Sequence, residues 1–217
     1  MKKCIIIANG QPPGKNVINF LAEKNFDVLI CADGGANSAR KLDLIPDYII
    51  GDLDSISEST LNYFSGKSII RKISRQNDTD VEKCLKFAIR KKISEAILIG
   101  VTGDRLDHTF CNLGIVLKYF DRIKLSLISE KSYLSAYSGS VEFRTFPGET
   151  ISLYGFNRQT KINSEGLKYP LKNFPLPFGI RESTSNEAVT NLVKLKITAG
   201  KIFIIRNFNI IKKYDLI

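Results

Sequence analysis

The sequence predicts an α/β N-terminal domain with a mainly parallel, Rossmann-like sheet, followed by a C-terminal antiparallel β-sandwich. Two observations lead to this fold class. Up to about residue 128, short β-branched runs alternate with longer segments of helical period, which is typical of βαβ units. Beyond that point the helical period is lost, and short β-rich runs are separated by glycine, proline and asparagine. We therefore expect two domains, at residues 1–128 and 129–217.

In the first domain, strands and helices are expected to alternate along the chain. Strands are expected at residues 3–8, 28–32, 48–51, 68–72, 96–100 and 124–128. Helices are expected at residues 15–24, 36–42, 58–64, 80–91 and 107–120. The helix at 80–91 has the clearest signals, because Thr79 can cap it and Glu82 completes the pattern of a capping box. An apolar stripe at helical spacing is formed by Val81, Cys84, Leu85 and Ala88. In the second domain, strands are expected at residues 141–146, 150–155, 187–197 and 201–205.

Composition places the chain among ordinary globular proteins. A hydrophobic content of 43% is enough for a packed core, and the net charge of +10 suits an anionic partner such as a nucleotide, a nucleic acid or a membrane surface. Charge alone selects none of these, since the basic residues are dispersed. Aromatic residues are not interleaved with them, so a nucleic-acid-binding module is disfavoured.

Cysteine usage and the N-terminus bear on the compartment. The four cysteines stand singly among apolar residues without zinc-ligand spacing, so we expect small buried side chains at Cys4, Cys31, Cys84 and Cys111. The N-terminal apolar run is too short for a signal sequence and is interpreted as the first strand. No run approaches the ~18 to 20 apolar residues that span a bilayer. We therefore expect a cytoplasmic protein with no membrane partner.

Acidic residues occur in three clusters, at residues 51–55, 77–80 and 102–108, and each cluster follows an expected strand. The carboxyl ends of parallel strands meet at one edge, so these loops can converge on a hard cation and its phosphate ligands. In an extended segment Asp52 and Asp54 would point to the same side, and Ser55 could cap the next helix. Asp78 and Asp80 have the same spacing, although the dipole of the helix favours a carboxylate at Asp80 even without a metal.

Neighbouring residues add groups suited to an organic ligand and to phosphate. Gln76 and Asn77 offer uncharged hydrogen-bonding groups that could orient an amine or a heterocycle. In the third cluster, glycines allow close approach of backbone N–H groups to phosphate, and Arg105 can bind a phosphate through two donors. His108, the only histidine, is more readily explained as a structural hydrogen-bonding residue than as a general base.

A further strand-to-helix turn lies at residues 32–37 and carries Asp33, Gly34, Gly35 and Asn37. Two glycines after an aspartate suit a nucleotide lying across the end of a strand. The segment is neither a G-x-G-x-x-G nor a Walker A sequence, so a Rossmann dehydrogenase and a P-loop kinase are disfavoured.

Six segments, taken together and in order, closely resemble the motifs of the thiamine pyrophosphokinase family. They are ADGGAN at 32–37, GDLDS at 51–55, NDTD at 77–80 with KCL at 83–85, GDRLDH at 103–108, GLKYPL at 166–171 and STSN at 183–186. The resemblance spans both expected domains. It implies a homodimer with a composite active site, an α/β nucleotide-binding domain and a β-sandwich for thiamine binding and dimerisation. It also implies Mg²⁺-dependent transfer of pyrophosphate from ATP to the hydroxyl of thiamine, giving thiamine diphosphate and AMP.

The resemblance assigns roles to individual residues. Those implied in catalysis are Asp54, Asp80, Arg105 and Asp107, and the implied metal ligands are Asp52, Asp54 and Asp80. The nucleotide would be bound by Asp33, Gly34, Gly35, Asn37, Gly103, Arg105 and His108. Thiamine would be held by Gln76, Asp78, Ser183 and Asn186. The alternative is another metal-dependent, nucleotide-using phosphotransferase acting on a small substrate, which would not need Gln76 or the 183–186 segment.

Overall fold

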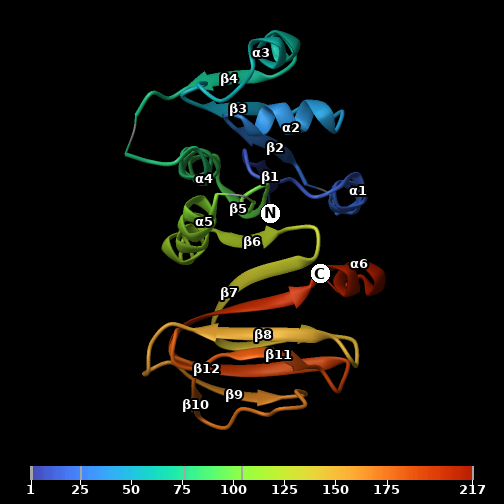
Figure 1. Ribbon diagram of the computed structural model, residues 1–217, viewed down its shortest axis with the longest axis vertical. Helices are drawn as coiled ribbons and strands as arrows, with labels where there is room; N and C mark the ends of the chain where they lie inside the picture. Colours follow the sequence, from blue (N-terminus) through green and yellow to red (C-terminus); the bar gives the residue numbers. More distant parts are fainter. Residues whose placement is uncertain (1, 25, 76, 104, 217) are drawn as a thin grey trace. The chain divides into compact units, whose positions relative to one another are not determined.

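The computed structural model describes residues 2–24, 26–75, 77–103 and 105–216. The chain divides into two compact units, Met1–Glu130 and Lys131–Ile217, so the division falls two residues after the boundary expected at residue 128. Helices and strands alternate in the first unit, whereas the second is almost entirely β-structure (Figure 1). Among the described residues, no helix is both long enough and apolar enough to cross a bilayer.

The first unit is built on a parallel sheet. Its strands are β1 (Lys2–Ile7), β2 (Val28–Ala32), β3 (Tyr48–Gly51), β4 (Ile69–Lys72), β5 (Ile93–Ile99) and β6 (Lys124–Ile128). Their order across the sheet is β6-β5-β1-β2-β3-β4, and every neighbouring pair is parallel. The expected mainly parallel sheet is therefore confirmed, with β5 beginning three residues before its expected start at residue 96.

The order of the strands changes direction between β1 and β5, and this change creates the point where such sheets bind ligands. From β1 the chain moves outward to β4, and it then returns to place β5 on the other side of β1. The loops after β1 and β5 are joined there, because Gly10 N–H donates to Gly100 O at 2.7 Å and Gln11 N–H donates to Thr102 O at 2.9 Å. Both loops therefore lie side by side at the carboxyl edge.

The helices cover both faces of this sheet. They are α1 (Lys15–Ala22), α2 (Gly35–Lys41), α3 (Glu58–Phe64), α4 (Asp80–Arg90) and α5 (Leu106–Lys118). All of them lie within two residues of their expected bounds. In Figure 1, α4 and α5 lie on one side of the sheet and α1 and α2 on the other. Helix α4 packs against β1, β2, β3 and β5, so its N-terminus is anchored near the middle of the sheet.

The expected signals in α4 are mostly confirmed. The apolar stripe is buried, and the Thr79 hydroxyl accepts a hydrogen bond from Glu82 N–H at 3.3 Å. The Glu82 side chain, however, accepts hydrogen bonds from Lys118 Nζ at 2.5 Å and from the Tyr119 hydroxyl at 3.1 Å. This carboxylate therefore joins α4 to the end of α5.

Two smaller expectations are wrong. Helix α3 is capped by Ser57, whose hydroxyl accepts from Thr60 N–H, because the chain turns for several residues after β3 before the helix begins; Ser55 therefore does not cap it. Cys111 is exposed, while the other three cysteines are buried as expected. Its apolar neighbours were misleading, because the first half of α5 is mostly exposed and the buried residues of this helix begin at Asn112.

The second unit is antiparallel, as expected. Its elements are β7 (Ser132–Arg144), β8 (Thr150–Gly155), β9 (Lys161–Glu165), β10 (Phe174–Pro175), β11 (Ser183–Glu187), β12 (Leu192–Asn207) and α6 (Phe208–Tyr214). Strand β12 pairs with β7 along most of its length. Its first half also pairs with β9, and its second half with β8, which in turn pairs with β11. An aliphatic core includes Ile151, Leu153, Ile162, Leu195 and Ile204.

The expected break between strands at 187–197 and 201–205 is wrong, because β12 is continuous. Its register against β7 shifts between Ile197 and Ile202, where Ala199 and Gly200 have φ of 56° and 156°. A bulge of this kind bends a strand without ending it. The Ala-Gly pair therefore marks a bend rather than a turn.

Candidate functional site

Asp33 begins the loop that follows β2, and it is buried with only 2% of its surface exposed. Its φ of 43° is in the left-handed region, which aspartate tolerates better than most residues. A Cβ at Gly51 would lie 2.6 Å from Cβ of Asp33, so glycine at the end of β3 is required for the two loops to approach. One carboxylate oxygen, Oδ2, accepts from Ser55 N–H at 3.0 Å. The other, Oδ1, is buried and has no hydrogen-bond partner among the described residues.

The loop after β3 carries both Asp52 and Asp54, and the Asp54 side chain also lies beside Asp33, whose pKa it raises. Leu53 has a φ of 67°, so the segment turns, and the extended geometry expected for Asp52 and Asp54 is wrong. Asp54 is exposed, and its carboxylate accepts a hydrogen bond from the Ser55 hydroxyl at 2.8 Å. Asp52 is half-buried and faces the first turn of α4.

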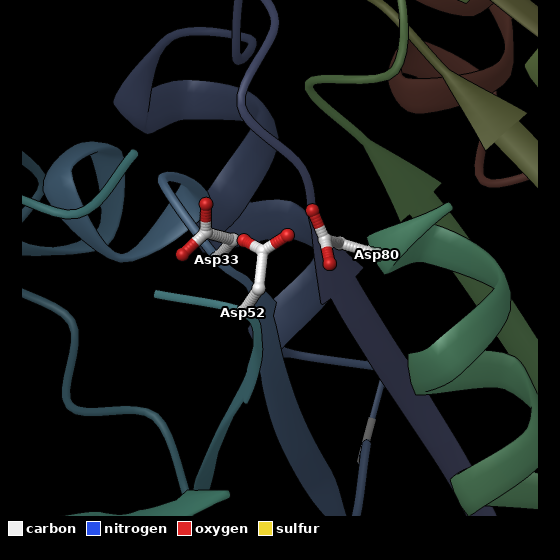
Figure 2. A group of neighbouring side chains, drawn as sticks. All are labelled: Asp33, Asp52 and Asp80. Atoms are coloured by element: carbon white, nitrogen blue, oxygen red, sulfur yellow. The ribbon is translucent and has the colours of Figure 1, made fainter. Parts of the chain in front are cut away.

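Three carboxylates from three elements converge at this place (Figure 2). Asp33 follows β2, Asp52 follows β3 and Asp80 is the first residue of α4. One oxygen of each lies within 4.8 Å of one oxygen of each of the others, a spacing that could hold a metal ion. We call these residues the aspartate cluster. Asp33, which the resemblance connected with the nucleotide, stands in this group beside Asp52 and Asp80.

Lys83 is the cation of the aspartate cluster, and sequence reasoning gave it no role. It lies three residues after Asp80 on α4 and is only 4% exposed. Its Nζ lies 2.8 Å from Asp80 Oδ1 and 4.0 Å from Asp52 Oδ2. Lysine is rarely buried without a charged partner, so its position on the buried side of α4 was the signal that could have identified it.

Burial and neighbouring charges shift the pKa values of Asp33 and Lys83. Burial is the largest influence on Asp33 and raises its pKa, and the Asp80 carboxylate raises it further against the opposing hydrogen bonds from Ser55. For Lys83, burial works against the charged form, but the nearby aspartates outweigh it and the pKa of Lys83 is raised. The lysine is therefore held as a cation among carboxylates that repel one another.

The segment before α4 is organised separately from the aspartate cluster. Asp78 forms ion pairs with Lys86 and, at 3.7 Å, with Arg75 Nε. The hydrogen bond from Lys86 lowers the pKa of Asp78, so its carboxylate is kept ionised. Asn77 is exposed next to it. Gln76, expected to contact thiamine, lies outside the described residues.

The loop between β5 and α5 is exposed. Arg105 donates to Asp107 through Nε at 2.9 Å and through Nη2 at 2.5 Å, and this pairing holds the pKa of Asp107 well below its usual range. His108 Nε2 lies 3.9 Å from the same carboxylate. Gly103 is exposed and has a φ of 150°. The Arg105 guanidinium group, which is expected to bind phosphate through two donors, therefore directs both donors at Asp107 in this structure.

The turn after β2 supports the aspartate cluster. A Cβ at Gly35 would lie 2.1 Å from Ile7 O, so this glycine allows α2 to begin against β1, and the neighbouring Gly34 is also buried. The Asn37 side chain donates to Ser55 O at 2.9 Å and accepts from Ser57 N–H at 3.1 Å. It therefore fixes the loop after β3, which carries Asp52.

In the second unit, Ser183 and Asn186 lie on β11. Asn186 is 2% exposed, and its amide donates to Tyr169 O at 2.8 Å and to the Ser183 hydroxyl at 3.2 Å, while its oxygen accepts from Tyr169 N–H at 3.1 Å. The Asn186 side chain is thus used within the unit, where it fixes the segment around Tyr169. Ser183 is partly exposed.

Carboxylates at the carboxyl edge of a parallel α/β sheet suit a divalent cation and the phosphates that it binds. The fold and the site thus indicate a two-unit α/β enzyme of phosphate-transfer chemistry.

Comparison with known proteins leads to the same class of enzyme. Residues 21–127 match the family model for the thiamin pyrophosphokinase catalytic domain, and residues 140–202 match that for the thiamin pyrophosphokinase vitamin B1 binding domain. The chain belongs to the thiamin pyrophosphokinase family.

Individual relatives support this assignment. Thiamine pyrophosphokinase 3 of Oryza sativa subsp. japonica is 30% identical over 190 residues, which cover 73% of this chain and 70% of the relative. Thiamin pyrophosphokinase 1 of Caenorhabditis elegans is 27% identical over 201 residues, covering 86% and 82%. The crystal structure of thiamine pyrophosphokinase from Bacillus subtilis matches with a TM-score of 0.83 at 23% identity, covering 95% of this chain and 99% of that one. The fold is therefore that of the family along nearly the whole chain.

Proposed function

We propose that this chain transfers the pyrophosphoryl group of ATP to the hydroxyl of thiamine, which gives thiamine diphosphate and AMP. The observation that carries the proposal is the aspartate cluster, placed at the carboxyl edge of the sheet in a member of this family. In the reaction, the thiamine hydroxyl oxygen forms a bond to the β-phosphorus, and the bond from that phosphorus to the oxygen bridging the α- and β-phosphates breaks. The hydroxyl proton leaves to a carboxylate, for which Asp80 and Asp107 are the candidates.

The aspartate cluster fits a magnesium ion. The buried Oδ1 of Asp33 has no partner among the described residues, although a buried carboxylate oxygen left unpaired is unfavourable. Asp52 and Asp80 supply two further oxygens of the hard type that Mg²⁺ prefers. When bound, the ion would neutralise polyphosphate charge and favour attack at phosphorus. We therefore assign its protein ligands to Asp33, Asp52 and Asp80.

The remaining residues would bind and orient the substrates. The turn at Gly34 and Gly35 and the loop at Gly103 would lie next to the phosphates of the nucleotide, and Arg105 would exchange Asp107 for a phosphate when ATP is present. Asn37 acts indirectly, by holding the loop of Asp52.

Thiamine would be bound by residues contributed by two protomers. Asp78 offers a carboxylate that attracts the cationic thiazolium, and Ser183 offers a hydroxyl whose position Asn186 fixes. We also propose a homodimer in the cytoplasm, in which β11 of one protomer completes the site on the aspartate cluster of its partner.

The reaction is tested by measuring AMP release from ATP and Mg²⁺ with and without thiamine. AMP formed only with thiamine, in equal amount to thiamine diphosphate, is the expected result. Formation of ADP would mean transfer of a single phosphoryl group and would contradict the proposed reaction.

The dimer is tested by subunit exchange between an Asp52→Asn protein and a Ser183→Leu protein, each weakly active alone. A two-fold dimer with shared sites gives a heterodimer with one intact site, so activity should rise toward about one quarter of wild type. No recovery after verified exchange would place each site within a single chain.

A further inference from the structure

Lys83 is unusual because it is a cation buried at a place expected to bind a cation. Only 4% of its surface is exposed, and its ammonium group contacts Asp80 directly and lies 4.0 Å from Asp52. Burying a lysine is unfavourable unless its charge is compensated. Since an apolar side chain would fill this part of α4 without that penalty, the charge itself needs an explanation.

The net charge of the site suggests an explanation for the buried lysine. The three members of the aspartate cluster carry a formal charge of −3, and Lys83 reduces it to −2, which equals the charge of one divalent cation with opposite sign. Asp33 provides independent evidence of a ligand, because this member of the aspartate cluster is 2% exposed and its Oδ1 is buried with no hydrogen-bond partner among the described residues. Lys83 does not supply that missing contact, since its ammonium group pairs with Asp80 at 2.8 Å and lies 4.0 Å from Asp52.

We propose that Lys83 is a positioning residue that serves as the permanent counter-charge of the aspartate cluster and keeps its affinity for a divalent cation low. The inference rests on the metal site of the proposed function. In the metal-free protein, Lys83 offsets the repulsion among the carboxylates and holds Asp80 toward them. Because Mg²⁺ is bound largely through substrate phosphates, a weak protein site allows the ion to arrive and leave with the polyphosphate.

The test measures binding of Mn²⁺ alone to the nucleotide-free protein, by electron paramagnetic resonance of the free ion. Lys83→Met removes the charge, whereas Lys83→Gln also removes it but keeps a hydrogen-bond donor for Asp80. Both variants should bind Mn²⁺ at least about tenfold more tightly, because a positive charge a few ångströms from a divalent ion weakens binding by at least that factor even at the dielectric constant of water. Lys83→Arg, which keeps the charge, should stay within about threefold of wild type.

Lys118→Met is the matched control. It removes one lysine that pairs with a carboxylate of α4, Glu82, and changes the net charge of the protein equally. Its Mn²⁺ affinity should equal that of wild type, because Lys118 pairs with Glu82 and not with the aspartate cluster. A tenfold gain in this control would show that net charge, and not the position of Lys83, controls binding, and would overturn the inference.

Thermal unfolding separates this role from a purely structural one. Without metal, Lys83→Met should have a lower Tm than wild type, and Mn²⁺ should raise its Tm by more than it raises that of wild type. A lower Tm with unchanged or weaker Mn²⁺ binding would overturn the inference. If Lys83→Met does not fold, the same comparison is decided with Lys83→Gln, which fills the site with a side chain that can still bond to Asp80.

Asp52→Asn distinguishes failure of this inference from failure of the proposed function. Loss of Mn²⁺ binding in this variant shows that the probe reports on the aspartate cluster. If wild type binds no Mn²⁺ that depends on Asp52, the metal assignment is refuted, and the inference with it. If wild type binds it and the neutral Lys83 variants bind it no more tightly, only the inference is refuted.

Discussion

The aspartate cluster and the loop between β5 and α5 are both rich in charge at the same edge of one sheet, but they differ in how their charges are held. The cluster is largely buried, with Lys83 packed among its carboxylates. In the loop, Arg105 and Asp107 are exposed and pair with each other. One group is fixed before a substrate arrives, and the other can exchange its partner.

This difference indicates a division of labour. Fixed carboxylates in a site of reduced solvent access act strongly on a bound ion, because they need no reorganisation when it arrives. An exposed arginine can leave its aspartate at small cost, since an exposed ion pair contributes little to stability. We therefore expect large effects on turnover from the cluster, and smaller effects, mainly on nucleotide binding, from the loop.

The sharpest test of the comparison is Asp52→Asn. Turnover should fall by at least ~10²-fold, because single contacts of this kind are commonly worth about 3 kcal/mol in the transition state. Stability without metal should be unchanged or higher, since the substitution relieves repulsion with Asp33 and Asp80. Steady-state kinetics at saturating substrates and thermal unfolding in EDTA measure the two quantities. A large loss of stability would indicate that Asp52 has a structural role.

Asp54→Asn is the matched control on the same loop. Its side chain is exposed and bonded to Ser55, so we expect a loss of no more than about tenfold, as for a group that does not bind the reacting phosphates directly. A loss equal to that of Asp52→Asn would show that the loop rearranges on ligand binding and brings Asp54 into the site.

The next prediction concerns a buried polar group outside the cluster. Asn186→Ala should lower the free energy of unfolding of the protein by about 2 kcal/mol, because it removes the two hydrogen bonds by which the buried Asn186 amide holds the backbone N–H and C=O of Tyr169. Thr184→Ala, an exposed neighbour on β11, should change it by less than about 0.5 kcal/mol. Urea denaturation measures both. A stable Asn186→Ala protein that has lost thiamine binding would instead assign this side chain to the ligand.

Arg105→Lys tests the exposed loop. A lysine cannot reproduce the two-donor fork on a phosphate, so kcat/KM for ATP should fall by roughly tenfold. Stability should not change, because both partners of the Arg105–Asp107 pair are exposed. Arg122→Lys, an exposed substitution just beyond the other end of α5, should leave both quantities unaltered. Wild-type kinetics in Arg105→Lys would show that Arg105 has no role in ATP binding and only forms an ion pair with Asp107.

Periodicity was sufficient to predict the first unit. The parallel sheet and five helices were recovered within a few residues, because alternating strand and helix patterns repeat there and α4 has strong capping signals. In the second unit, the course of β12 was not predictable. Whether Ala199 and Gly200 form a turn or a bulge depends on the partner strands, which local sequence does not identify.

The site was predicted in part. Acidic residues at strand ends predicted where the charged loops meet, but they did not predict which three aspartates the structure brings together. The left-handed conformation of Leu53 separates Asp52 from Asp54, and the close approach allowed by Gly51 brings Asp33 in. Both depend on contacts between loops that are distant in the sequence. Lys83 was missed for a similar reason, since its burial results from packing of α4 across the sheet.

The smallest effect is expected at His108, a further residue of the exposed loop whose side chain could in principle accept a proton. Its ring is exposed and lies 3.9 Å from Asp107, too far for a hydrogen bond that would orient it. His108→Gln should therefore reduce kcat by less than about threefold, as expected for a residue that does not transfer the proton. The dependence of kcat on pH should keep the shape of wild type. If His108 were the base, the dependence of kcat on pH would change its shape in the variant, and the fall in kcat would be ~10²-fold or more.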